Sequence, residues 1–238
     1  MNRFLLILVF LLVSSCELPF IIQADQYIEP TPVEKSNSVP EYESVWDRIR
    51  ASHSDHQTKL DEKTLHYINT YLANPVQLNK LLEKGRYFIY FVLEELDRYR
   101  LPPELALLPY IESNYDPFSI SASGAMGIWQ FMPATARIYG LKDTWWYEQR
   151  HDPLISSKAA VRYLAYLHNR FNKEITYTLA AYNGGPTLLE KKIKLNRKAN
   201  KPTNYENLTL PKQTQEYVPK FKAILELVLN AKKYGINL

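Results

Sequence analysis

The stretch Leu105-Ala106-Leu107-Leu108-Pro109-Tyr110-Ile111-Glu112 places one carboxyl group at the end of an apolar run. Pro103 suits the first turn of a helix, and Asp116-Pro117 suits its end. Leu108 and Glu112 are four residues apart, so they share one face of that helix. A carboxyl group among leucines resists ionisation, which raises its pKa and lets it hold a proton near neutrality. Glu112 is therefore a candidate general acid.

Helical periodicity extends to both sides of this run. Apolar residues recur every three or four positions from Pro75 to just before Leu101, which predicts an amphipathic helix, and weaker helical patterns precede it. The pattern predicts helices around 45–49, 60–72, 133–140, 156–171, 175–182 and 214–234, and a loop or short hairpin over 119–129. The sequence contains no internal repeat and no strand-rich region. These observations predict a mostly α fold.

Composition limits the classes of function. The chain has 238 residues, 46% of them hydrophobic and 13% aromatic, which is typical of a globular domain. The net charge is only +4, from 29 basic and 25 acidic residues. Residues 191–201 form the densest basic stretch, which we interpret as a solvated loop that tolerates an anionic polymer rather than a nucleic-acid groove. No nucleic-acid partner is expected.

The first fifteen residues have the pattern of a secretory signal peptide. Arg3 is followed by an apolar segment over 4–13, which is too short to span a bilayer as a stop-transfer helix. Val13-Ser14-Ser15-Cys16 resembles the lipobox of bacterial lipoproteins, in which the cysteine becomes acylated. The pattern predicts a lipid anchor at Cys16, the single cysteine of the chain; the alternative is a soluble exported protein.

The region after Cys16 is predicted to be a tether. Residues 16–41 contain four prolines among polar residues, a spacing that no helix survives. The domain organisation expected is therefore a signal peptide over 1–15, a flexible tether over 16–41 and one catalytic domain over 42–238. Glu17, rather than aspartate, after the cysteine resembles lipoproteins that are released to the outer membrane.

Two polar motifs could be structural or functional. Gln130 lies between Trp129 and Phe131, where a buried amide could bridge the core or contact a ligand. Tyr182-Asn183-Gly184-Gly185 could be a helix C-cap or part of a site. His53 and His56 have a spacing that could hold a metal, but two further ligands with suitable spacing are missing, so a solvated pair is expected. We predict no metal and no cofactor.

Several motifs together resemble one family. Glu112-Ser113, Ser121-Ala122-Ser123-Gly124-Ala125, Gly127-Ile128-Trp129-Gln130-Phe131-Met132-Pro133 and Ala181-Tyr182-Asn183-Gly184-Gly185 resemble the soluble-type (SLT, family 1) lytic transglycosylases of bacterial cell walls. Tyr217-Val218-Pro219-Lys220 and Lys233-Tyr234-Gly235 are similar to the branch of membrane-bound lytic murein transglycosylase D, without the LysM repeats common in it. The resemblance implies a lysozyme-like (goose-type) α+β domain with additional N-terminal helices.

The resemblance also implies roles for individual residues. Glu112 matches the catalytic acid and base, the Tyr182 hydroxyl would face it, and Asn183 would bind an acetamido group. The other residues implied to bind substrate are Ser121 and Ser123 near the scissile sugar, Gln130 and Met132 along the cleft, and Tyr217 at its floor. The family often has Glu-Thr where this chain has Gln213-Thr214, so a role for that acid is in doubt here.

The sequence near Glu112 offers one well-placed acid. Asp116 precedes a proline and is interpreted as a helix-end residue, and Asp143, Glu148 and Asp152 lie in a polar loop. The predicted reaction is cleavage of the β-1,4 bond between N-acetylmuramic acid and N-acetylglucosamine in peptidoglycan, with formation of a 1,6-anhydro end. The alternatives are a muramidase, which would use water, and a catalytically silent peptidoglycan-binding lipoprotein. The expected location is the periplasmic face of the outer membrane, with soluble periplasm as the alternative.

Overall fold

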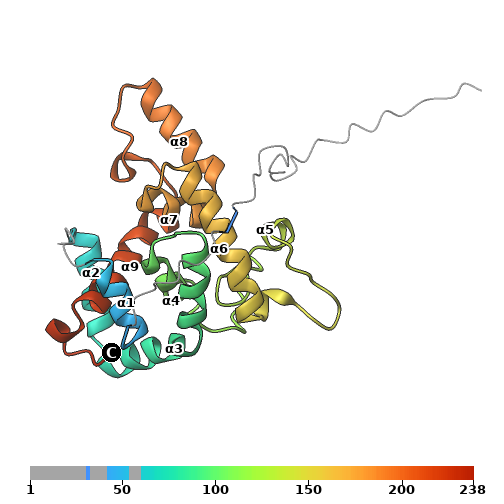
Figure 1. Ribbon diagram of the computed structural model, residues 1–238. Helices are drawn as coiled ribbons and strands as arrows, with labels where there is room; N and C mark the ends of the chain where they lie inside the picture. Colours follow the sequence, from blue (N-terminus) through green and yellow to red (C-terminus); the bar gives the residue numbers. More distant parts are fainter. Residues whose placement is uncertain (1–30, 33–41, 54–59) are drawn as a thin grey trace, which may run out of the picture.

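The computed structural model describes residues 31–32, 42–53 and 60–238 (Figure 1). The predicted signal peptide, Cys16, His56 and nearly all of the predicted tether lie outside these residues. The helices are α1 (Val45–Ala51), α2 (Glu62–Leu72), α3 (Pro75–Arg98), η2 (Pro103–Leu107), α4 (Leu108–Glu112), α5 (Pro133–Ile138), η3 (Gln149–His151), α6 (Pro153–Arg170), α7 (Ile175–Gly184), α8 (Pro186–Lys198), η4 (Tyr205–Asn207), α9 (Lys212–Leu229) and η5 (Ala231–Tyr234). In the described part of the chain, strand pairing is limited to isolated bridges. The prediction of a mostly α fold is confirmed.

Proline marks the start of five of these helices. Pro75, Pro103, Pro133, Pro153 and Pro186 each occupy the first helical position. Proline fits there because its fixed φ suits the helix and its missing N–H would have had no partner within the helix. The helix starts predicted at Pro75, Pro103 and Pro133 therefore follow from backbone chemistry. The prediction placed the start of α6 near residue 156 rather than at Pro153 and did not include α8.

Helix α3 supports the central helix α4 through one glycine. A side chain at Gly85 would place its Cβ 2.2 Å from the Tyr110 hydroxyl oxygen, so only glycine admits the ring. The Tyr110 hydroxyl then donates a hydrogen bond of 2.7 Å to the Leu82 carbonyl oxygen. This contact fixes α4 against α3, and α4 also packs against α9 (Figure 1).

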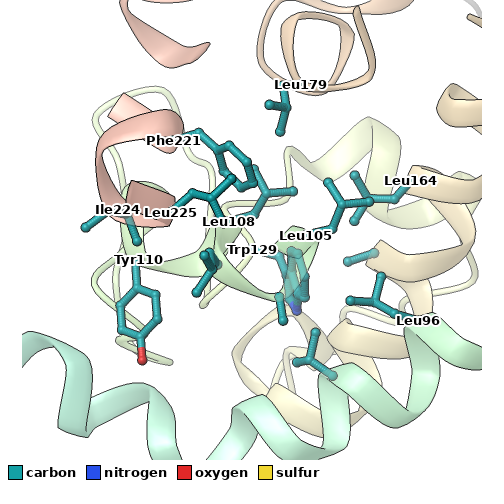
Figure 2. Packing of buried hydrophobic residues seen from close by; sticks show 14 of the residues in the cluster. Leu96, Leu105, Leu108, Tyr110, Trp129, Leu164, Leu179, Phe221, Ile224 and Leu225 are labelled. Carbon is teal, nitrogen blue, oxygen red and sulfur yellow. The ribbon is translucent and has the colours of Figure 1, made fainter. Parts of the chain in front are cut away.

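The hydrophobic core surrounds this short central helix. Figure 2 shows Leu105 and Leu108 meeting Phe221 and Leu225 of α9, with Trp129 close to them. All five side chains are buried, and the Trp129 indole N–H donates 2.8 Å to the Ser157 hydroxyl of α6. Burial of large apolar side chains is the main source of stability, at about 1.5–3 kcal/mol each. The core therefore holds the C-terminal end of α4 at a fixed position.

The segment between α4 and α5 is a compact loop with hairpin character. Bridges join Ile120 to Met126 and Met126 to Phe131. The Ser121 amide donates 2.9 Å to the Ala125 carbonyl, and the Gly127 amide donates 3.0 Å to the Ser119 carbonyl. The prediction of a loop or short hairpin here is confirmed.

The prediction of a solvated loop over 191–201 is wrong, because α8 continues to Lys198. The high charge of this stretch favoured a loop, but Leu189 and Ile193 are four residues apart and pack against the hydrophobic core. Lysine, leucine and glutamate also favour helix. Lys191, Lys194 and Lys198 lie on the other side of the same helix.

Two predicted helix ends also shift. Helix α4 ends at Glu112 rather than near Asp116, because Asn114 and Tyr115 have positive φ of 55° and 56°. The predicted helix over 214–234 begins at Lys212 and divides at Asn230 into α9 and η5. Among the described residues, no helix is both long enough and apolar enough to pass through a lipid bilayer.

Candidate active site

Glu112 is the last residue of α4 and is half-buried. Its position follows from the local sequence. The apolar residues before it are anchored in the core, and the left-handed residues after it turn the chain away. The Ser113 hydroxyl donates 3.0 Å to the Ile128 carbonyl, which ties this helix end to the loop before Trp129. The carboxyl group thus lies where α4, that loop and α9 meet.

The environment of Glu112 changes its acidity. Burial raises the pKa of the Glu112 carboxyl from 4.5 to about 7, because a charged carboxylate loses hydration there. The Tyr217 hydroxyl of α9 donates a hydrogen bond to Oε1 of Glu112, and this contact partly lowers the pKa again. Near neutrality the protonated and ionised forms therefore coexist. That is the condition under which one group both gives and takes a proton efficiently.

Tyr182 differs from the expectation that its hydroxyl faces the glutamate. Its hydroxyl donates 2.9 Å to the Trp129 carbonyl oxygen, and its ring lies 5.4 Å from that of Tyr163. Tyr182 is still close enough for the charge of Glu112 to contribute to the rise in the Tyr182 pKa, after burial as the main cause. The hydroxyl in contact with Glu112 is that of Tyr217.

Asn183 is oriented by a residue that sequence reasoning overlooked. The Thr214 hydroxyl of α9 donates 2.9 Å to Oδ1 of Asn183, and Thr214 is 3% exposed. Because Oδ1 accepts this bond, the amide group presents its N–H donors on the other side. The Tyr205 hydroxyl fixes Thr214 in turn, by donating 2.7 Å to its carbonyl oxygen. In the sequence, the pair Gln213-Thr214 is informative only because Gln213 replaces an acid of the family, and it does not indicate this contact of Thr214.

Gln130 forms a bridge within the loop. Its Nε2 donates 2.9 Å to the Gly127 carbonyl and 3.2 Å to the Ser119 carbonyl. The residue itself has a φ of 48°, so its backbone turns sharply. Of the two alternatives weighed from the sequence, the structure contains the hydrogen-bond bridge.

Of the remaining predicted residues of this loop, Ser121 is partly buried and Ser123 and Met132 are exposed. The Ser121 and Ser123 hydroxyl oxygens lie 3.0 Å apart, and the Ser121 oxygen also accepts 2.9 Å from the Ala125 amide. Met132 is 43% exposed at the start of α5. Ser121 therefore stabilises a tight turn, while Ser123 and Met132 present side chains to solvent.

Arg150 is a second residue that sequence reasoning missed. Only 4% exposed, its guanidinium donates 3.0 Å to the Gly124 carbonyl and 3.2 Å to the Phe131 carbonyl, and pairs with Glu148 at 2.7 Å. The backbone of Arg150 also packs on Gly127, where a Cβ would lie 1.8 Å from the Arg150 carbonyl oxygen. An arginine in a polar run gave no sequence signal that it would be buried.

Other acids of the region have local structural roles. Asp116 accepts 2.9 Å from the Phe118 amide, Glu148 pairs with Arg150, and Asp152 caps α6. The His53 Nε2 lies 3.5 Å from Glu104. Across the described ranges, no three histidine, cysteine or acidic side chains gather as a metal site would require.

Two cavities lie away from these residues. One, of about 790 Å³, is lined mainly by α1 and α3, and one of about 420 Å³ is lined by the start of α2, η4 and α9. Neither is lined by any of the predicted site residues. The candidate site is therefore defined by the cluster around Glu112 rather than by these cavities.

Comparison with known proteins places Glu112, Gln130 and Asn183 of this cluster within a family domain. Residues 91–205 match the family "Transglycosylase SLT domain". The chain is 38% identical over 168 residues to "Membrane-bound lytic murein transglycosylase D" of Escherichia coli (strain K12), an alignment that covers 71% of this chain and 37% of that protein. The chain thus spans little more than a third of the length of this relative.

Two further relatives match shorter segments. A "Putative tributyltin chloride resistance protein" of Alteromonas sp. (strain M-1) is 37% identical over 98 residues, covering 41% of this chain and 47% of that protein. "Membrane-bound lytic murein transglycosylase F" of Alcanivorax borkumensis is 34% identical over 111 residues, covering 44% and 22%. The mostly helical architecture agrees with the lysozyme-like fold of the SLT domain. The chain therefore contains a domain of the SLT transglycosylase family, over residues 91–205.

Proposed function

We propose that this protein is a lytic transglycosylase that cleaves the β-1,4 bond between N-acetylmuramic acid and N-acetylglucosamine in peptidoglycan. Glu112 protonates the glycosidic oxygen that leaves C1 of the muramic acid. The resulting carboxylate then takes the proton of the C6 hydroxyl of the same sugar, whose oxygen bonds to C1. The products are a 1,6-anhydro end and a free N-acetylglucosamine hydroxyl, and Glu112 is protonated again.

The observation that carries this proposal is the pKa of about 7 of the half-buried Glu112 carboxyl. A general acid works best when its pKa lies near the operating pH. The Tyr217 hydroxyl supports the first half of the cycle, because its hydrogen bond favours the ionised carboxylate that the first proton transfer produces.

No carboxyl group of the described residues shifts the pKa of Glu112, which supports an internal nucleophile over water. Ordinary glycosidases use two carboxyl groups about 5 to 9.5 Å apart. Among the described residues, the groups that shift the Glu112 pKa are apolar surroundings and Tyr217, with no second carboxyl group. An attacking hydroxyl on the same sugar needs no second carboxylate, because it is already held next to C1.

Identification of the terminal sugar in released muropeptides tests the proposal. Purified sacculi are digested with the protein and the products are analysed by mass spectrometry. Anhydromuramic ends are the expected result. Reducing ends would contradict it in favour of a muramidase, and absence of release would favour a non-catalytic wall-binding protein.

We also propose that the protein acts in the cell envelope, held by an acylated Cys16 at the periplasmic face of the outer membrane. The lipobox-like sequence supports the anchor, and the relatives named as membrane-bound murein transglycosylases support the envelope. Cys16→Ala should move the protein from the membrane fraction to the soluble periplasmic fraction. Retention of this variant in the membrane pellet would contradict the anchor.

A further inference from the structure

Helix α8 carries most of the unusual charge of this chain. Residues 191–201 contain six basic and no acidic residues, and the 23 basic residues elsewhere are outnumbered by the 25 acidic ones. The whole positive excess of the protein therefore comes from this short segment. In Figure 1 the helix extends away from the rest of the molecule, beyond α7.

Three lysines form a row on the outer face of α8. Lys191, Lys194 and Lys198 are exposed and follow the spacing i, i+3, i+7, which places them on one side of a helix. The buried Leu189 lies on the opposite side. With a rise of 1.5 Å per residue, the row is about 10 Å long. We call these three residues the lysine row.

Within the part of the chain that the structure describes, no acidic side chain pairs with the lysine row. Glu190, the one acid of α8, is held by Arg170 of α6 through bonds of 2.7 and 2.9 Å. Of the ion pairs formed within the described residues, none involves the six basic residues of this segment. Neighbouring like charges repel, so their concentration here is a cost to the isolated protein.

Helix α8 is fixed by contacts at both ends and begins next to the candidate site. Gly185 is both the C-cap of α7 and the N-cap of α8, so α8 starts three residues after Asn183. At the far end, Nδ2 of Asn196 donates 2.8 Å to the Pro202 carbonyl and 2.9 Å to the Asn207 carbonyl. The lysine row therefore lies on a helix whose position is fixed and which extends away from the site.

We propose that the lysine row is a docking surface for the carboxylate groups of peptidoglycan peptide stems. The inference rests on the proposed function, because a glycan strand in the site would extend its stems beyond the reacting sugars. The stems carry free carboxylates, which are complementary to three exposed ammonium groups. The row thereby recognises the polymer beyond the cleaved bond.

The test uses two triple variants of the full chain with the same loss of charge. One is Lys191→Gln/Lys194→Gln/Lys198→Gln. The control is Lys84→Gln/Lys142→Gln/Lys232→Gln, at exposed positions of other elements. KM and kcat are measured on glycan strands with stems and on the same strands stripped of stems by an amidase.

Loss of the lysine row should raise KM on stem-bearing strands roughly fivefold above the control, because each exposed pair contributes a few tenths of a kcal/mol. The difference should shrink at high salt. On stripped strands the two variants should have equal KM. Equal KM of both variants on stem-bearing strands would overturn the proposal, as would an increase of the same size on stripped strands.

A lipid surface is the competing partner, and vesicles of phosphatidylglycerol and phosphatidylcholine test it. Weaker vesicle binding of the lysine-row variant, with an unchanged KM on stem-bearing strands, would overturn the proposal in favour of the membrane. If the wild type cleaves neither strand, the proposed function fails. Co-sedimentation of both variants with stem-bearing and stripped sacculi then still tests the lysine row, where equal binding would overturn it.

Discussion

The cluster around Glu112 and the outer face of α8 both concentrate polar groups, but burial gives them opposite properties. In the cluster, burial raises the pKa of the Glu112 carboxyl to about 7, although the hydrogen bond from Tyr217 lowers it in part. On α8, three lysines are exposed to water, which screens each charge. Burial therefore changes the acidity of a single polar group, whereas exposed charges have an appreciable effect only when several act together.

The largest effect that would sharpen this contrast is the loss of turnover in Glu112→Gln. The amide fills the same volume but cannot donate and regain a proton, so the rate of muropeptide release should fall by about 10³-fold or more. Glu206→Gln, at an exposed position of η4, should retain the wild-type rate. Circular dichroism checks that both variants are folded. Undiminished digestion by Glu112→Gln would refute its role.

Removal of the buried arginine should have the next largest effect. Arg150→Met removes the guanidinium that donates to the Gly124 and Phe131 carbonyls and pairs with the Glu148 carboxylate. We expect a loss of about 3 kcal/mol in the free energy of unfolding, measured with urea. Arg197→Met, at an exposed position of α8, should change it by less than about 0.5 kcal/mol. Equal losses in the two variants would break the contrast between buried and exposed charge.

The raised pKa of Glu112 predicts a pH-dependent cost to stability. Between pH 4.5 and about 7 the folded state binds more protons than the unfolded state, so this residue lowers stability as the pH rises. Glu112→Gln should thus be more stable than the wild type at pH 8, by roughly 1–3 kcal/mol. We expect a value in the lower part of this range because the Glu112 side chain is only partly buried. The gain should vanish near pH 4.5. Urea titrations at both pH values measure it, and a gain that does not depend on pH would contradict the assigned pKa.

The smallest expected effect concerns the orientation of Asn183. Thr214→Val keeps the shape of the side chain but removes the hydroxyl that fixes Oδ1. We expect a loss of about 1 kcal/mol in stability and a several-fold rise in KM with a smaller change in kcat. Thr214→Ser should restore KM, and Thr187→Val at the exposed start of α8 should leave it unchanged. A KM that Thr214→Ser does not restore would assign Thr214 a packing role only.

Local chemistry made most of the fold predictable. The prolines that open α3 and α5 and the apolar spacing of α3 are features of neighbouring residues, so helix starts and buried faces follow from them. Most of helix α8 was not predicted, because its many lysines favoured a solvated loop and only Leu189 and Ile193 indicate a buried face. The early end of α4 depends on left-handed residues that carry no strong sequence signal.

The sequence by itself determined the apolar run before Glu112, the mostly helical class and the motifs shared with the SLT family. Only the tertiary structure decided which groups meet. Tyr217 is 105 residues from Glu112 and Thr214 is 31 from Asn183, and both contacts exist because α9 packs against α4 and α7. The physical reason is that spacing along a chain fixes neighbours within one helix, whereas a partner on another helix is fixed by core packing.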